Sequence, residues 1–123
     1  MAIHFLVHGV HHAFPCDAYR LVFPPILGFS IWFPMLTPIV KLLCGSHAPI
    51  VCAGILSGYV CYDMTHYYMH HSNPAEGTWA KDMKIYHMQH HYKNGLVGFG
   101  VTNKFWDRVF DTELTKEKVK KVE

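Results

Sequence analysis

The sequence predicts an all-α fold: an integral membrane helical domain with a transmembrane hairpin and histidine-bearing helices on the cytosolic side. Three observations support this class. Two long stretches, residues 21–40 and 42–62, contain no Asp, Glu, Lys or Arg. Eleven histidines occur among 123 residues, and all except His47 lie in or beside three short blocks. Only 16% of the residues are charged, although 50% are hydrophobic, which is little charge for a soluble domain.

Composition also excludes several classes of protein. The length allows one domain at most, and a formal charge of +2 is too small to suggest a nucleic-acid partner. The four cysteines form no C-x-x-C pair and mostly lie in apolar runs, so neither a disulfide framework nor a zinc finger is expected. No phosphate-binding glycine loop is present.

The chain divides into four predicted segments. Residues 1–20 carry the first histidine block, and residues 21–62 form the hairpin. Twenty helical residues cover roughly 30 Å, the thickness of the hydrocarbon core of a bilayer. Gly45, Ser46 and Pro49 predict the turn between the two spans. Four prolines in the first span argue against a straight helix, but membrane helices tolerate kinks.

After the hairpin the sequence becomes polar. Residues 63–112 carry the second and third histidine blocks, and residues 113–123 form a basic tail. The tail ends in Lys120-Lys121-Val122-Glu123, which resembles a dilysine signal for retrieval to the endoplasmic reticulum. Arg20, Lys81 and Lys84 flank the spans on the histidine side, so the positive-inside rule predicts cytosolic histidine blocks and a cytosolic C-terminus.

The chemistry is expected from the histidine blocks, because residues three or four apart share one face of a helix. A two-span hairpin returns to the side it left, so the blocks before and after it meet on one face of the membrane. Eight imidazoles are too many for one ion and suit two, with iron, zinc or copper left open on chemistry alone. The eight predicted ligands are His8, His11, His12, His66, His70, His87, His90 and His91.

Three other histidines are expected to play lesser parts. His71 points about 100° away from His70 on a helix and is the weakest member of its block. His47 in the turn is expected to be an interfacial residue, and His4 a structural or supporting one.

These motifs together resemble a known family. HGVHHAFPCDAYRLVFPP, YDMTHYYMHH and KIYHMQHHYK, followed by GFGVTNKFWDRVFDT, are similar to the catalytic domain of eukaryotic fatty acid 2-hydroxylases, within the fatty acid hydroxylase and sterol desaturase superfamily. The resemblance runs from about Ile3 to Thr112.

The resemblance implies a multi-pass enzyme of the endoplasmic reticulum membrane. Such an enzyme uses O₂ and two metal ions to hydroxylate carbon 2 of a long-chain fatty acyl substrate for 2-hydroxy sphingolipid synthesis. Its electrons come from a b-type cytochrome. Iron is the expected metal and zinc the alternative. Asp63 and Tyr62, one turn before His66, are the expected catalytic helpers, because metal-bound histidines usually donate their second N–H to a carboxylate.

Two departures from the family pattern are apparent. The family carries an earlier H-x(3–4)-H pair and a b-type cytochrome domain, and neither occurs before His8. We therefore expect the chain to be incomplete and its metal site to be under-coordinated. The alternatives are a sterol-modifying oxidase of the same superfamily and a non-catalytic truncated isoform. A transition-metal transporter is disfavoured because both charge-free runs lack histidine, apart from His47 in the turn.

The sequence leaves open the role of several methionines and tyrosines near the blocks. They line an acyl path or simply pack the core: Met64, Met69, Met83, Met88, Tyr67, Tyr68 and Tyr86.

Overall fold

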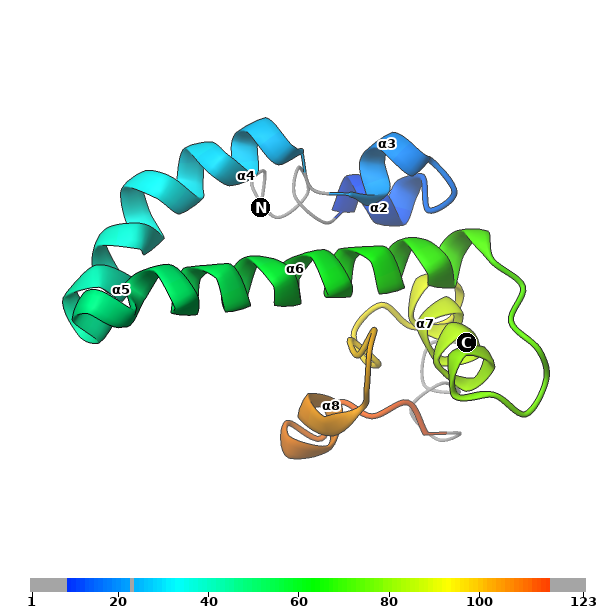
Figure 1. Cartoon of the computed structure of the whole chain (residues 1–123). Coiled ribbons are helices and arrows are strands. Elements are labelled where there is room, and N and C mark those ends of the chain that lie inside the picture. The colour runs from blue at the N-terminus through cyan, green and yellow to red at the C-terminus, as the bar shows by residue number, and fades with distance from the viewer. Residues whose placement is uncertain (1–8, 23, 116–123) are drawn as a thin grey trace. The chain divides into compact units, whose positions relative to one another are not determined.

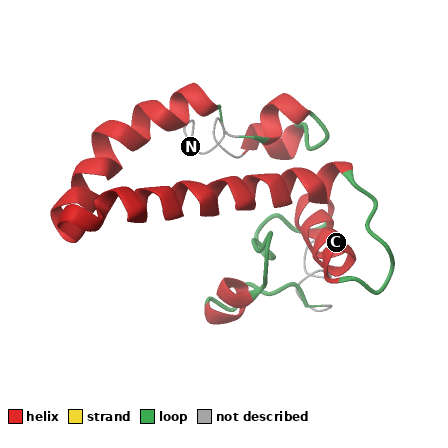
Figure 2. Ribbon diagram, viewed as in Figure 1, coloured by secondary structure: helices red, strands yellow, loops and turns green. Residues whose placement is uncertain are grey.

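The computed structural model of the chain describes residues 9–22 and 24–115, and within these ranges it contains helices and loops but no strand (Figure 2). The prediction of an all-α fold is therefore confirmed. The helices follow in the order α2 (Val10–Ala13), α3 (Ala18–Leu21), α4 (Pro25–Ile31), the π-helix η2 (Trp32–Leu36), α5 (Thr37–Cys44), the 3-10 turn η3 (Gly45–His47), α6 (Ala48–His71), α7 (Trp79–Tyr92) and α8 (Phe105–Val109) (Figure 1).

The chain forms two compact units. One unit is Val22–Met64, and the other combines Met1–Leu21 with Thr65–Glu123. The long helix α6 contributes its first part to the former unit and its last turns to the latter. We call Val22–Met64 the hairpin unit and the remainder the histidine unit.

The hairpin unit has one arm built from α4, η2 and α5 and a second arm from α6, which run in opposite directions (Figure 1). The turn lies where Gly45, Ser46 and Pro49 predict it. Gly45 ends α5 with a φ of 54°, a left-handed conformation that glycine adopts without steric cost.

The prolines of the first arm explain its irregularity. Pro25 lies in the first turn of α4, where a missing N–H costs nothing, and Pro38 lies in the first turn of α5, which follows η2 directly. Pro34 lies inside the arm, and the helix there widens into the π-turn η2. The carbonyl of Trp32 accepts bonds from the N–H of Thr37 and from the Thr37 hydroxyl, which is 3.4 Å away. The predicted kink is thus absorbed by a π-turn.

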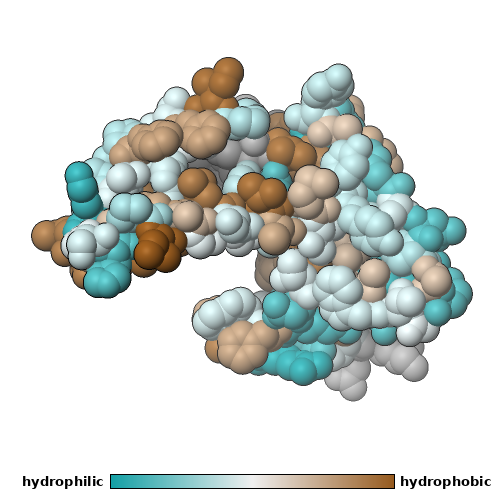
Figure 3. Space-filling model, viewed as in Figure 1, coloured by the Kyte–Doolittle hydropathy of each residue, from teal (hydrophilic) through white to brown (hydrophobic). Residues whose placement is uncertain are grey.

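The hairpin unit exposes many large hydrophobic side chains, which appear as brown patches among paler ones in Figure 3. One helical stretch of the described chain, Ala18–His71, is long and apolar enough to cross a membrane by length and composition, and only 6% of its apolar window is buried. Leu42 is 85% exposed and Ile26 is 84% exposed. Exposed apolar surface on this scale is expected of a lipid-facing segment rather than of a soluble core helix.

The histidine unit has a small apolar core of Met69, Met83 and Tyr86, with Leu114 packed against them. Their burial favours core packing over an acyl path for these three residues. Thr78 caps the N-terminus of α7, and its side-chain oxygen accepts a bond from the N–H of Lys81 at 3.3 Å. This cap fixes the start of the helix that carries the third histidine block.

Candidate metal centre

Seven of the eight predicted ligands lie in the described part of the chain, and three helices carry them. His11 and His12 lie on α2, His66 and His70 on α6, and the third block on α7 as His87, His90 and His91. His8 and His4 fall outside the described residues. On α6 and α7 the members are three or four residues apart and so share one helix face, whereas His11 and His12 on α2 are adjacent.

Five of these rings converge on one point. The group comprises His11, His66, His70, His87 and His91, whose nearest ring nitrogens all lie within 4.8 Å of one another. The Nε2 atom of His87 is 2.9 Å from Nε2 of His66 and 2.9 Å from Nε2 of His70. The His91 Nε2 atom is 3.1 Å from that of His87 and 3.1 Å from that of His11.

Such spacing suits metal ligation better than hydrogen bonding. A neutral imidazole carries one N–H, so His87 Nε2 can donate to only one of its three close Nε2 neighbours, which leaves lone pairs facing one another. Two nitrogens bound to an ion at about 2.1 Å and at right angles lie roughly 3.0 Å apart. The observed separations of 2.9 and 3.1 Å match that geometry, with one cation accepting every lone pair.

A second pair of rings adjoins this cluster. The Nε2 atoms of His12 and His90 are 3.1 Å apart, and the His12 ring stacks on His91 with centroids separated by 4.1 Å. His90 Nδ1 lies 2.8 Å from the carbonyl oxygen of Val97. Because a carbonyl only accepts, Nδ1 donates and His90 Nε2 keeps its lone pair for a metal. The pair His12 and His90 therefore lies beside the five-ring cluster and adds further nitrogen donors to it.

Burial keeps the His87 and His91 rings of α7 neutral. Loss of solvent lowers the pKa of His91 to about 2, and the neighbouring His12 and His70 contribute to this lowering. Loss of solvent also lowers the pKa of His87 far below its usual range, with His66 the largest charged contribution. A neutral imidazole has the lone pair that a metal requires, so these two rings are ready to bind an ion at neutral pH.

The two histidines predicted to lie outside the site are exposed. His71 stacks on Tyr67 of its own helix, with ring centroids 4.4 Å apart, and it is not among the five converging rings. His47 lies in η3, at the turn of the hairpin unit.

The predicted helpers Asp63 and Tyr62 lie in α6, before the histidine pair of that helix. The Asp63 carboxylate accepts a side-chain hydrogen bond from Tyr59, one turn earlier. Within the described part of the chain, His87 Nδ1 and His91 Nδ1 have no hydrogen-bond partner. The role assigned to Asp63 and Tyr62 stays a prediction.

One buried carboxylate that the sequence did not single out holds the loop beside His90 in place. Asp107 is 2% exposed and accepts four hydrogen bonds. The donors to Oδ1 are Phe99 N–H at 3.0 Å and the Thr112 hydroxyl at 2.8 Å. The donors to Oδ2 are the Tyr86 hydroxyl at 3.0 Å and Gly100 N–H at 2.8 Å.

These bonds fix the loop that touches His90. The Phe99 ring lies 5.2 Å from the His90 ring, and Val97 on the same loop accepts the His90 N–H. Asp107 is therefore a positioning residue for the third block. Its one signal in the sequence is an acidic residue inside the aromatic run FWDRVF.

Comparison with known proteins agrees with this geometry. Residues 1–112 match the sequence profile of the fatty acid hydroxylase family. The dihydroceramide fatty acyl 2-hydroxylase FAH2 of Arabidopsis thaliana is 45% identical over 109 residues, which cover 89% of this chain and 46% of the relative. The ceramide very long chain fatty acid hydroxylase SCS7 of Saccharomyces cerevisiae is 48% identical over 113 residues, covering 92% of this chain and 29% of the relative.

A solved structure agrees as well. The hydroxylase domain visible in full-length scs7p superimposes with a TM-score of 0.83 at 47% identity, covering 93% of this chain and 42% of that one. The human fatty acid 2-hydroxylase is 42% identical over 119 residues, covering 94% of this chain and 31% of the relative. The chain thus spans less than half the length of these relatives. On the profile match, the identities and the superposition, it belongs to the fatty acid hydroxylase family.

Proposed function

We propose that the chain forms the metal-binding part of a fatty acid 2-hydroxylase, which hydroxylates carbon 2 of a long-chain acyl group destined for 2-hydroxy sphingolipids. The observation that carries the proposal is the convergence of seven histidine rings from three helices in a member of this family. Relatives that are 45% and 48% identical bear names that specify fatty acyl hydroxylation.

The residues present fit two ions. His11, His66, His70, His87 and His91 would hold one, and His12 with His90 would contribute to the other. We place His8 in the same set by its spacing in the sequence. Iron is favoured over zinc because zinc has no redox chemistry. Bound there, the metal pair supplies activation of O₂, with electrons from a b-type cytochrome.

The chain's own residues orient and shield the site. His87 and His90 are each 2% exposed, so bulk water has little access to their nitrogens. The Val97 carbonyl holds the His90 ring by its second nitrogen, which is the role such an outer partner plays around metals. We assign Asp63 and Tyr62 a supporting part, in which they bind a proton or an ordered water next to His66.

We further propose that the hairpin embeds the chain in the endoplasmic reticulum membrane as a multi-pass segment, with both ends and the histidines cytosolic. The exposed apolar surface of the hairpin unit supports membrane insertion. Protease treatment of intact microsomes tests the orientation, since a C-terminal epitope should be digested without detergent. Protection of that epitope would contradict the proposed topology.

The function is best tested by exchanging this chain for the matching segment of a relative. The chain replaces the matching segment of yeast SCS7 in cells that lack that enzyme, and hydroxylated ceramides are measured by mass spectrometry. We expect product from the exchanged protein and from its His47→Ala variant, and none from its His87→Ala variant. Metal per chain, measured on the same proteins, should fall only in His87→Ala. Equal loss of product in the two variants would contradict the ligand assignment.

A further inference from the structure

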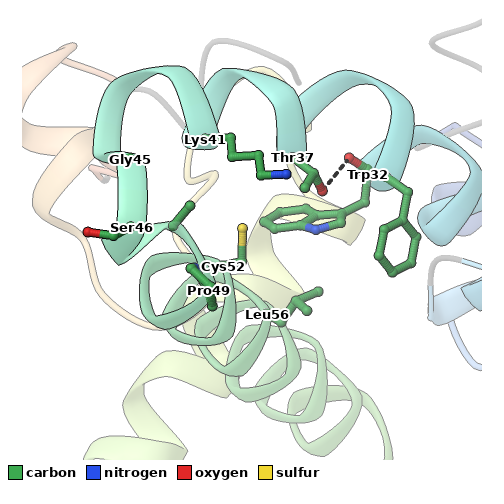
Figure 4. Close-up of a pocket in the computed structure, with 10 residues that line it drawn as sticks. Trp32, Thr37, Lys41, Gly45, Ser46, Pro49, Cys52 and Leu56 are labelled. Atoms are coloured by element: carbon green, nitrogen blue, oxygen red, sulfur yellow. Dashed lines mark hydrogen bonds between the residues drawn. The ribbon is translucent and has the colours of Figure 1, made fainter.

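The closed end of the hairpin unit contains a cavity of about 350 Å³ (Figure 4). Elements η2, α5, η3 and α6 line it, so it lies within one unit. Most of its wall is apolar and comprises Trp32, Phe33, Ala48, Pro49, Cys52 and Leu56. A volume of a few hundred Å³ with an apolar wall and few polar groups is typical of a small-molecule or lipid site.

The polar part of the wall carries one charge. Lys41 is the single Lys or Arg in residues 21–62, and no Asp or Glu occurs between Asp17 and Asp63. Among the described residues Lys41 has no ion pair. Its side chain extends over the cavity toward Thr37 and Trp32 (Figure 4). A charge without a counter-ion in its own segment needs an anion from outside the chain, or water.

The cavity wall is held in shape by the backbone. The Trp32 carbonyl at the start of the π-turn accepts both from the N–H and from the hydroxyl of Thr37, which joins the Trp32 and Thr37 walls. Gly45, with φ of 54°, closes the end of α5 beside Ser46. Single π-turns often occur at functional sites, and this one borders the cavity with Trp32 and Phe33.

From these observations we infer that the cavity binds an anionic phospholipid of the surrounding bilayer, which rests on the proposed membrane insertion of the hairpin. The headgroup phosphate lies at the Lys41 amine, and the first part of an acyl chain lies against Trp32, Cys52 and Leu56. Lys41 lies at the end of the predicted span 21–40, where a lysine is expected near the bilayer interface and its phosphate groups. Exposed apolar neighbours, Leu42 at 85% and Ile50 at 75%, offer a surface for the rest of the lipid.

The lipid proposed here is distinct from the acyl substrate. Cavity residues Ala48, Cys52 and Leu56 lie in the first part of α6, whereas His66 and His70 lie in its last turns. The headgroup position at Lys41 and the metal ligands are therefore associated with opposite ends of α6.

The test uses the full chain purified in detergent and mixed with dioleoyl phosphatidylglycerol or dioleoyl phosphatidylcholine, which carry the same acyl chains. Native mass spectrometry counts the lipid retained per chain. We expect one phosphatidylglycerol and little phosphatidylcholine. Lys41→Gln should weaken phosphatidylglycerol binding roughly fivefold, the effect of about one lysine near an anionic headgroup, whereas Lys41→Arg should retain it.

A second pair of variants tests the cavity itself. Cys52→Phe fills it, and Cys61→Phe makes the same change on the same helix outside its wall. We expect lipid retention to fall only in Cys52→Phe.

Three results would overturn the inference: equal retention of the two phospholipids, unchanged binding by Lys41→Gln, or equal effects of the two phenylalanine variants. Displacement of phosphatidylglycerol by equimolar oleate would also overturn it, in favour of a carboxylate site. Metal content is measured on the same samples and should not change, so failure here is separable from failure of the metal-site proposal.

Discussion

Substitution of Asp107 by asparagine should destabilise the loop that positions His90 and so weaken metal binding at the candidate centre. The carboxylate accepts two bonds at each oxygen, and each oxygen serves one backbone N–H and one hydroxyl. An amide group replaces one of the oxygens by a donor. The facing hydroxyl, Tyr86 or Thr112, can rotate and accept, but the facing backbone N–H of Gly100 or Phe99 cannot. Either orientation of the new amide thus orphans one buried N–H.

The cost follows from those bonds. An orphaned buried donor costs about 1–3 kcal/mol, and a bond to a charged acceptor contributes about 1.5–3 kcal/mol. We expect Asp107→Asn to lower the free energy of unfolding by about 3 kcal/mol. At several degrees per kcal/mol for a domain of this size, the melting temperature falls by roughly 10 °C.

The measurement is thermal unfolding in detergent, followed by tryptophan fluorescence, together with metal content per chain. Asp82→Asn is the control, because Asp82 is exposed in the first turn of α7, and it should shift the melting temperature by little. Asp107→Asn should lose its metal at lower chelator concentrations than the unsubstituted chain, because the loop that holds His90 is less firmly fixed. Equal behaviour of Asp107→Asn and Asp82→Asn would refute the positioning role.

Three further outcomes are expected. Gly98→Ala should lower the melting temperature, because Gly98 has φ of 75° and an added Cβ would collide with the Leu114 side chain; Gly58→Ala should be nearly neutral, since its Cβ would meet nothing within 4 Å. The metal-free protein should lose stability as pH falls below about 6.5, because histidines of the unfolded chain take up protons there, whereas His87 and His91 of the folded chain have lowered pKa values and do not. Thermal unfolding at about pH 7.5 and about pH 5.5 measures this change, and an equal melting temperature at the two values would contradict it. His71→Ala should retain its metal while His70→Ala loses it, as metal analysis of the two purified proteins will show, since only His70 joins the converging rings.

Local patterns in the sequence predict much of the architecture. The spacing of the histidines places each block on one helical face, and the structure brings seven of the rings together. Gly45, Ser46 and Pro49 predict the hairpin turn because glycine and proline restrict the backbone locally. The weaker role predicted for His71 also follows from the angle of about 100° between successive residues on a helix.

Other features depend on distant residues and were not predictable in this way. The partners of Asp107 come from residues 86–112, and nothing near it in the sequence indicates that four donors will surround it. Pro34 predicts a disturbed helix, but the sequence does not indicate that the disturbance is a π-turn in which both the N–H and the hydroxyl of Thr37 bond to the Trp32 carbonyl. The cavity beside Lys41 arises from the packing of two arms, which composition does not reveal.

The contact between His11 and His91 has a consequence for biosynthesis, because it joins residues 80 positions apart. Ribosomes add about 5–20 residues per second, so His91 emerges roughly 4 to 16 seconds after His11. Throughout that interval the first block lacks its α7 partners, and an ion can find only a fraction of its final donors. An ion bound once α7 has emerged closes a long loop, as a disulfide would, with a loop-closure contribution on the order of 4 kcal/mol. A complete set of donors for such an ion therefore exists only after α7 has been synthesised.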